Sequence, residues 1–121
     1  MLILDSNILI YALLPEYQKL RDFLRQKESA CSIVSKIEVL GYNKLTNDEI
    51  EAFRSLFDNI NILPLTWEIA DTAIKLRQTK KMSLGDSIIA ATSLAYHAEL
   101  LTANTKDFDW IENLNITNPI I

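Results

Sequence analysis

Short apolar stretches alternate with longer amphipathic segments along this chain. Short apolar runs bounded by polar residues are typical of strands that are buried on both faces of a parallel sheet. The pattern predicts strands at residues 2–4, 30–35, 60–65 and 99–104, with a fifth, edge strand at 115–121. The segments between them repeat apolar residues three or four positions apart, as one face of a helix requires. They predict helices at residues 8–14, 16–28, 36–45, 46–60, 66–81, 83–99 and 105–114.

Strands that alternate with helices predict an α/β fold with a mainly parallel central sheet of four to five strands. In such a sheet, binding sites form beyond the carboxyl ends of the strands. The 121 residues contain no linker, repeat or low-complexity segment, which predicts one domain over residues 1–121. The helix at 83–99 carries small apolar residues nearly all round, so we expect it to be deeply buried.

Composition excludes several classes of protein. With 49% hydrophobic and 23% charged residues, the chain is too apolar to be disordered. A net charge of −4 argues against a protein that coats nucleic acid, so any such contact must be local or assisted by metal ions. The single cysteine, Cys31, excludes an internal disulfide, and its apolar neighbours predict a buried side chain. We see neither a basic leader nor an apolar run of about 20 residues, and expect a cytoplasmic protein without membrane attachment.

Acidic side chains follow several of the predicted strands. Asp5 comes directly after the first strand, Glu38 one helical turn after the second, and Asn104 and Asp107 after the fourth. Asp86 lies in the first turn of the buried helix. Because the carboxyl ends of parallel strands share one edge of the sheet, we expect these side chains to gather there. Several carboxylates in one pocket repel each other unless a cation lies among them, and oxygen ligands suit Mg²⁺ or Mn²⁺.

Each of these residues also has a purely structural interpretation as a helix cap. Pairs with the spacing of a capping box or a related cap are Ser35–Glu38, Ser83–Asp86 and Asn104–Asp107, and Asp5 and Ser6 are candidate N-caps. A zinc site is not expected, because the lone His97 lies late in its helix and the chain has one cysteine.

Four segments together resemble the motifs of PIN domains. They are LDSNILIYAL at 4–13, SKIEVL at 35–40, DSIIAA at 86–91 and LLTANTKDF at 100–108. Their order and spacing resemble most closely the VapC toxins of bacterial toxin–antitoxin pairs, over the whole chain. The resemblance implies a three-layer α/β/α fold and a metal-dependent ribonuclease.

The resemblance also implies which residues form the site. The catalytic and metal-binding positions that match are Asp5, Glu38 and Asp86, with Asp107 or Asn104 at the fourth position. It implies that Asp5 and Asp86 hold the principal Mg²⁺ or Mn²⁺, and that Glu38 holds a second ion or orients the attacking water. Hydrolysis would then leave a 5′-phosphate and a 3′-hydroxyl. Ser6 and Thr102 match hydroxyl positions that steady the first acid, with a local turn or cap as the alternative.

The expected partners are RNA, a small antitoxin protein and a second copy of the chain. Candidate RNA-binding residues are Lys36, Lys80, Lys81 and Lys106, which can contact phosphates, and a solvated helix end is the alternative. The resemblance implies a homodimer and an antitoxin segment bound in a groove near the acids. Residues on the helices that would form this groove are Tyr42, Leu45, Phe53 and Phe57, although core packing is the favoured interpretation for most of them. Core or dimer packing is also favoured over base stacking for Trp67 and Trp110.

Two other classes of function remain open at this point. A receiver-like signalling domain also binds Mg²⁺ at an acidic edge, but it needs an aspartate after its third strand, where this chain has Pro64-Leu65-Thr66. The second alternative is a catalytically inactive PIN-like scaffold that binds metal, RNA or a protein partner, which the amide of Asn104 permits. Cleavage of RNA separates the enzyme from the scaffold.

Overall fold

The computed structural model describes residues 1–120. In chain order its elements are β1 (Leu2–Leu4), α1 (Ser6–Ala12), the 3₁₀ turn η1 (Pro15–Tyr17), α2 (Gln18–Arg25), β2 (Ser29–Ser32), α3 (Ile33–Leu40), α4 (Asn47–Asp58), β3 (Asn61–Leu63), α5 (Trp67–Thr79), α6 (Leu84–Ala95), β4 (Glu99–Leu101), the 3₁₀ turn η2 (Thr105–Asp107) and β5 (Ile116–Thr117). Among these helices, none combines the length and apolar character that crossing a membrane requires.

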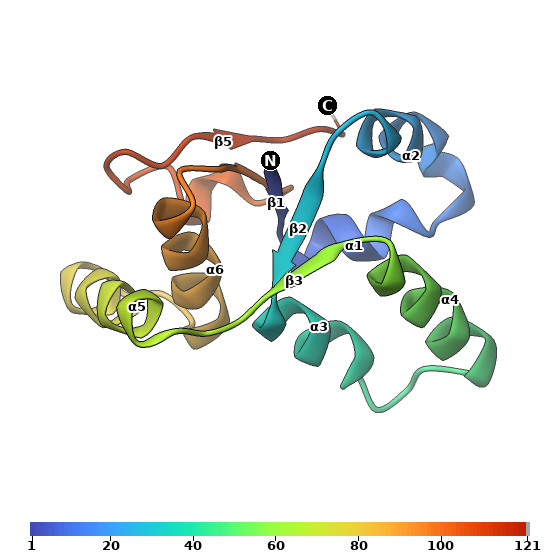
Figure 1. Ribbon diagram of the computed structural model, residues 1–121, viewed down its shortest axis with the longest axis horizontal. Coiled ribbons are helices and arrows are strands. Elements are labelled where there is room, and N and C mark those ends of the chain that lie inside the picture. Colours follow the sequence, from blue (N-terminus) through green and yellow to red (C-terminus); the bar gives the residue numbers. More distant parts are fainter. Residues whose placement is uncertain (121) are drawn as a thin grey trace.

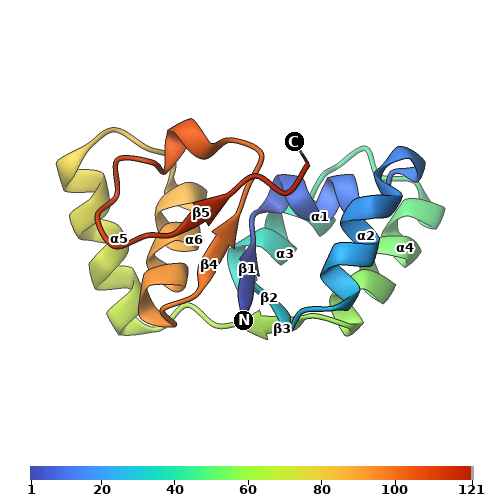
Figure 2. The same ribbon diagram turned by 90° about the horizontal axis from the view of Figure 1, so that it is seen from above.

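The described strands form one five-stranded sheet in the order β3-β2-β1-β4-β5, and every neighbouring pair is parallel. Helices α5 and α6 lie on one side of the sheet, and α1 to α4 lie on the other (Figures 1 and 2). The predicted α/β class with a three-layer α/β/α arrangement is therefore confirmed. The edge strand β5 is also parallel to its neighbour β4.

Strand β1 is buried on both faces, as its uninterrupted apolar sequence predicts. Leu2 and Leu4 pack into the cluster beneath α1 to α4, whereas Ile3 packs into the cluster beneath α6. This division follows from the two-residue period of a strand, which points successive side chains to opposite faces. The strand therefore lies at the centre of the molecule, and its carboxyl end at Asp5 has a fixed position.

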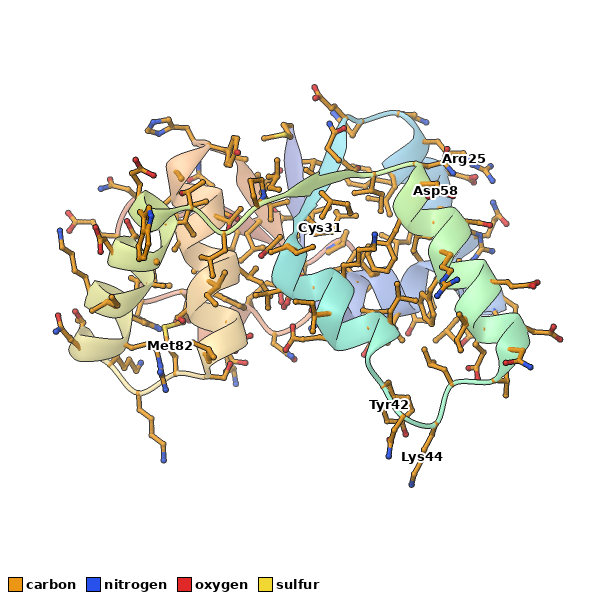
Figure 3. All side chains as sticks on the ribbon, turned by 60° about the horizontal axis from the view of Figure 1, so that its bottom comes forward. Arg25, Cys31, Tyr42, Lys44, Asp58 and Met82 are labelled. Atoms are coloured by element: carbon orange, nitrogen blue, oxygen red, sulfur yellow. The ribbon has the colours of Figure 1, made fainter. Side chains whose placement is uncertain are left out.

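The core beneath α1 to α4 contains the side chains expected to be buried. Cys31 is fully buried on β2 (Figure 3), and burial raises the pKa of its thiol to about 12, so it stays protonated near neutral pH. Phe53 and Phe57 are buried on α4, which confirms core packing for both. Tyr42 instead projects from the α3–α4 loop and is 56% exposed (Figure 3).

The boundary between β2 and α3 differs from the sequence prediction. The strand ends at Ser32 and the helix begins at Ile33, so the predicted strand at 30–35 is too long by three residues. Ser32 has extended backbone angles and its side chain accepts a hydrogen bond from the Val34 amide, 3.1 Å away. Ser32 is therefore the N-cap. The predicted Ser35–Glu38 capping box is wrong, because Ser35 lies inside the helix and is fully buried.

The predicted helix at 105–114 is also wrong, because only the short 3₁₀ turn η2 forms there. The indole nitrogen of Trp110 donates to the carbonyl of Asp107 at 3.0 Å. In an α-helix this carbonyl would accept from Ile111, whose amide bonds to Phe108 instead. Asn104 makes no side-chain capping bond to this turn, so its predicted role as a cap is wrong as well.

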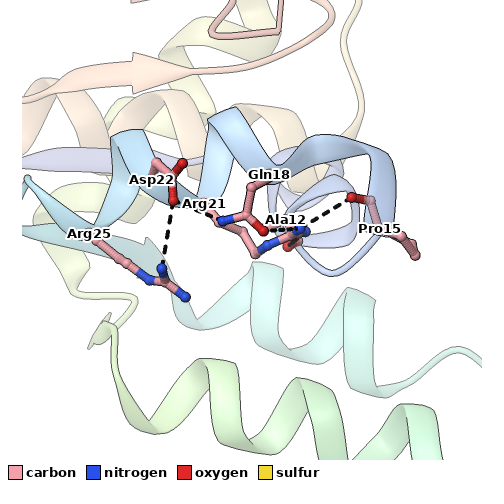
Figure 4. A network of polar contacts seen from close by, with 6 residues as sticks. All are labelled: Ala12, Pro15, Gln18, Arg21, Asp22 and Arg25. Atoms are coloured by element: carbon pink, nitrogen blue, oxygen red, sulfur yellow. Dashed lines mark hydrogen bonds and ion pairs between the residues drawn. The ribbon is translucent and has the colours of Figure 1, made fainter.

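Helix α2 fixes the far end of α1. The guanidinium of Arg21 donates to the carbonyls of Ala12 at 3.0 Å and Pro15 at 3.2 Å, and to the side chain of Gln18 at 2.9 Å (Figure 4). It also donates to the carbonyl of Leu14 at 2.7 Å. The last carbonyls of a helix have no partner within the helix, and this side chain supplies one. Arg21 thereby helps to hold α1, whose first turn carries the residues described next.

Candidate active site

The sheet reverses its strand order between β1 and β4. From β1 the chain first adds β2 and β3 on one side, and later adds β4 and β5 on the other (Figure 2). Ligand sites in open α/β sheets form beyond the carboxyl ends of strands at such a switch point. Asp5 follows β1 and Thr102 follows β4, so these two side chains lie at this position.

Asp5 is held in one orientation from two sides. Its Oδ1 accepts the Ser6 amide at 2.8 Å, which caps α1, and its Oδ2 accepts the Thr102 hydroxyl at 2.6 Å. Only 5% of Asp5 is exposed. Burial raises the pKa of its carboxyl, the two hydrogen bonds partly offset this, and the charges of Glu38 and Asp107 raise it further. The Thr102 hydroxyl thus contacts the first acid, whereas Ser6 contacts Asp5 through its backbone amide and its hydroxyl bonds to Glu38.

Glu38 lies on α3 and reaches across to the first turn of α1. Its Oε1 accepts a hydrogen bond from the Ser6 hydroxyl at 2.7 Å. The hydroxyls of Ser6 and the buried Ser35 are 3.1 Å apart. Since the single proton of Ser6 lies on its bond to the carboxylate, we infer that Ser35 donates to Ser6 in turn. Glu38 therefore lies at the acidic edge and caps no helix. Ser35, inside α3, bonds to the Ser6 hydroxyl that in turn donates to Glu38.

Gly85 gives Glu38 the room it occupies. A Cβ atom at this glycine would lie 2.7 Å from Glu38 Oε2 and 3.2 Å from its Cδ, well inside ordinary contact distances. The first turn of α6 thus packs its backbone against the carboxylate of α3. Gly85 was not among the residues predicted from the sequence. The available signal was a glycine, a poor helix former, in the first turn of an otherwise apolar helix.

Asp86 follows Gly85 and faces the other acids. Its amide donates to the Ser83 hydroxyl at 3.1 Å, so Ser83 is the N-cap of α6 as predicted. The pKa of the Asp86 carboxyl is raised to about 6, chiefly by burial and then by the charges of Asp5 and Asp107. Asp107 thus lies close enough to act on both Asp5 and Asp86. The charges of Asp5, Asp107 and Glu38 all act on Asp86, so the four carboxylates that the sequence singled out lie in one neighbourhood.

Asn104 and Asp107 occupy different positions relative to these acids. The backbone amide of Asn104 donates to the Thr102 hydroxyl at 3.0 Å, which orients that hydroxyl toward Asp5. The neighbouring amide of Ala103 donates to the side chain of Asn7 at 3.3 Å. Asn7, which the sequence analysis did not single out, thus ties the loop after β4 to α1. Asn104 therefore acts on the site through its backbone amide, which bonds to Thr102, whereas Asp107 acts through the charge of its carboxylate.

Three of the four candidate RNA-binding lysines lie together beside the acids. A cavity of about 270 Å³ is lined by Lys80, Lys81, Met82, Ser83, Asp86, Lys106, Asp107 and Trp110. Lys36 lies elsewhere, near Cys31, where its charge counteracts the effect of burial on the pKa of the thiol. The cavity therefore adjoins the acidic edge directly and carries positive charge of its own.

The donor atoms fit a hard divalent cation, although they do not form a closed cage. Within the part of the chain that the structure describes, no group of three or more His, Cys, Asp or Glu side chains converges closely enough to hold a metal ion as placed. Magnesium usually takes one or two carboxylates and keeps several waters, so it needs no such cage. The donors are oxygens only, and the Asp5 carboxylate keeps about two of its four lone-pair positions free.

The arrangement defines an α/β domain whose acidic site lies at the switch point of a parallel sheet. A family model described as the PIN domain matches residues 2–113, and the chain belongs to this family. Comparison with curated proteins gives no match.

Several solved structures with the same fold are toxin–antitoxin complexes. A chain of a toxin–antitoxin complex from Klebsiella pneumoniae is 31% identical, with a TM-score of 0.80 and 98% of each chain covered. A chain of VapBC-1 from nontypeable Haemophilus influenzae is 23% identical, with a TM-score of 0.83 and 99% of this chain and 98% of that one covered. A chain of DNA-bound VapBC from Salmonella typhimurium is 16% identical, with a TM-score of 0.87 and coverage of 98% and 97%.

Proposed function

We propose that this protein is a metal-dependent endoribonuclease that hydrolyses phosphodiester bonds of RNA and acts as the toxin of a toxin–antitoxin pair. The observation that supports the proposal is that Asp5 follows the central strand of a PIN fold at its switch point, within range of the charges of Glu38 and Asp107, and that Asp5 and these two acids also act on Asp86. The matching chain in a toxin–antitoxin complex, at 31% identity over nearly its whole length, supports the toxin assignment.

In this proposal Asp5 and Asp86 hold Mg²⁺ or Mn²⁺ with help from Asp107, and Glu38 takes a second ion or the attacking water. A bound divalent cation lowers the pKa of water and offsets the charge that builds on a phosphate. Burial and mutual repulsion raise the pKa values of Asp5 and Asp86, and a nearby cation opposes both effects. A bound cation would therefore stabilise the ionised forms of the same acids that are proposed to hold it.

The remaining polar groups hold the acids in position. Thr102 and the Ser6 amide occupy one lone pair on each oxygen of Asp5 and so fix its rotation. The Ser6 hydroxyl keeps Glu38 turned toward α1, and Gly85 admits the carboxylate beside α6. Hydrogen bonds that orient acidic ligands are worth roughly ten- to a hundredfold in metal affinity or activity. Water is the nucleophile, and cleavage leaves a 5′-phosphate and a 3′-hydroxyl.

The proposed protein partners are an antitoxin and a second copy of the chain. Similar structures include complexes of toxins with antitoxins, and three of them are described as bound to DNA. Ile74 on α5 and Leu84 at the start of α6 are 54% and 62% exposed, and such apolar side chains on neighbouring helices support a homodimer contact. A cytoplasmic location remains a prediction of the sequence.

The test is cleavage of a pool of structured and single-stranded RNAs by purified protein freed of antitoxin. We expect fragments with Mg²⁺ or Mn²⁺, none in EDTA, and recovery when the metal is added back. A folded protein that binds Mg²⁺ but leaves every RNA in a broad pool intact would favour the inactive scaffold.

A further inference from the structure

The cavity beside the acids has the opposite charge from the protein as a whole. Lys80, Lys81 and Lys106 line it against two carboxylates, Asp86 and Asp107, which gives a local balance of three positive and two negative charges. The whole chain carries a net charge of −4. The three lysines therefore offer partners for phosphates at this cavity, next to the acids.

An aromatic ring forms one wall of the same cavity. Trp110 is partly buried and packs against the core beneath α6, as favoured from the sequence, while it also lines the cavity. Its indole nitrogen donates to the backbone carbonyl of Asp107 at 3.0 Å. The ring is thus fixed to the backbone of one of the proposed metal-binding acids. The Lys80 ammonium lies 5.6 Å from the centre of the ring, so a cation covers one of its faces.

We propose that this cavity, lined by Trp110, Lys81 and Lys106, is a subsite for one unpaired nucleotide of the RNA, next to the phosphate that is cleaved. The base stacks on Trp110, and its phosphate is neutralised by Lys81 and Lys106. A base on the covered face displaces the Lys80 ammonium, which is then free to pair with a phosphate. The inference rests on the proposed function and adds to it a residue that contacts the base, Trp110, beside the phosphate that is cleaved.

Size and chemistry both fit this occupant. The volume of about 270 Å³ admits one base with part of its sugar and phosphate, but not the stacked pairs of a duplex. Aromatic rings beside a basic groove are the usual means of binding single strands, because every base has a face that can stack. In a duplex these faces are covered by neighbouring bases, so the subsite discriminates against paired RNA.

The two tryptophans of the chain allow a direct test. Trp67 is the first residue of α5 and is 86% exposed, so core packing of this side chain is wrong. Lys80 and the Trp110 ring lie beyond the last residue of α5. A helix of 13 residues is about 20 Å long, so Trp67 is well separated from the cavity. The tryptophan fluorescence of a Trp67→Phe variant therefore comes from Trp110 alone, and that of the matched Trp110→Phe variant comes from Trp67 alone.

The variants are titrated with short single-stranded RNA of mixed sequence and with a blunt RNA duplex, at low salt and in EDTA so that nothing is cleaved. Tryptophan fluorescence is recorded. We expect single-stranded RNA to quench the fluorescence of Trp67→Phe and to leave that of Trp110→Phe nearly unchanged. The duplex should quench the fluorescence of neither variant. Equal quenching by single-stranded and duplex RNA, or none by either, would overturn the subsite.

Affinity gives an independent readout. Trp110→Leu keeps an apolar side chain against its neighbours and should weaken binding of single-stranded RNA by about tenfold. Lys106→Gln should weaken it and reduce its salt dependence. Wild-type affinity in both variants would contradict the proposal. Binding is measured without metal, so the subsite and the nuclease can fail separately. Quenching by single-stranded RNA without any cleavage after metal is added would support the subsite and reject the nuclease. Cleavage by the wild type, with unchanged RNA affinity in both variants, would support the nuclease and reject the subsite.

Discussion

Burial of Asp86 beside other carboxylates at the switch point should lower the stability of the folded protein, and Asp86→Asn isolates this cost. The pKa of Asp86 rises from an ordinary 3.8 to about 6, a change of about 2 units. At about 1.4 kcal/mol per unit, the charged form would be disfavoured by up to about 3 kcal/mol in the fold. Because the side chain is partly exposed, solvent screening reduces this, and we expect about 1–2 kcal/mol.

The direction in which stability changes with pH follows from the binding of protons by the folded and unfolded states. The folded state holds the Asp86 proton more tightly than the unfolded chain does. Below about pH 4 the carboxyl is protonated in both states and imposes no cost. As pH rises through about 6 the folded protein must ionise it, and this part of the stability is lost. Asparagine cannot ionise, so Asp86→Asn should be more stable than the wild type at pH 8 and nearly equal to it at pH 4.

Urea unfolding at both pH values, in EDTA and at low salt, measures the difference. An exposed acid on α5, Asp71, provides the matched control, because Asp71→Asn changes the same group outside the site. The reasoning would be refuted if Asp86→Asn were no more stable at pH 8, or if its advantage were the same at both pH values. Activity should be lost in Asp86→Asn even though stability is gained.

Other substitutions test single contacts. Glu38→Gln should unfold as the wild type does, since the side chain is exposed and caps no helix, but should cleave RNA about a hundredfold more slowly. Gly85→Ala should retain or slightly raise helix stability while its Cβ displaces Glu38, so cleavage should fall with unchanged unfolding; a fully active alanine variant would contradict this contact. Arg21→Met should cost about 2–3 kcal/mol in urea unfolding because it leaves helix-end carbonyls without a donor, whereas Arg25→Met, which removes only an exposed ion pair, should cost less than about 1 kcal/mol.

The sheet could be predicted from the sequence because buried parallel strands leave a simple signal. An apolar run such as Leu2–Leu4, followed at once by Asp5, fixes both the strand and the edge at which its acid lies. The same reasoning placed Asp86 near Asp5, since a deeply buried helix must pack on the sheet. The predicted sheet topology therefore placed acids that are far apart in the sequence close together in space.

Boundaries set by a single side chain could not be predicted in this way. Ile33 and Val34 are β-branched and read as strand, but the Ser32 hydroxyl starts the helix before them. The segment after η2 has a helical pattern, yet the indole of Trp110 takes the Asp107 carbonyl that a helix would use. Each case turns on one hydrogen bond, which no pattern of apolar residues records.

Close contacts in the site were missed for a related reason. Gly85 matters through the side chain it lacks, which leaves space for Glu38 from a different helix. Ser35 has the spacing of a cap and turned out to support Ser6. Both roles depend on how α1, α3 and α6 meet, and the sequence does not specify that packing at the level of single atoms.

The most direct test of the account is RNA cleavage by the wild type and by Asp5→Asn, side by side with Mg²⁺, with the chemistry of the fragment ends determined. Asp58→Asn, an exposed acid at the end of α4 (Figure 3), is the matched control. We predict fragments with 5′-phosphate and 3′-hydroxyl ends from the wild type and the control, and none from Asp5→Asn. Equal cleavage by Asp5→Asn would show that this acidic edge is not the active site and would contradict the account.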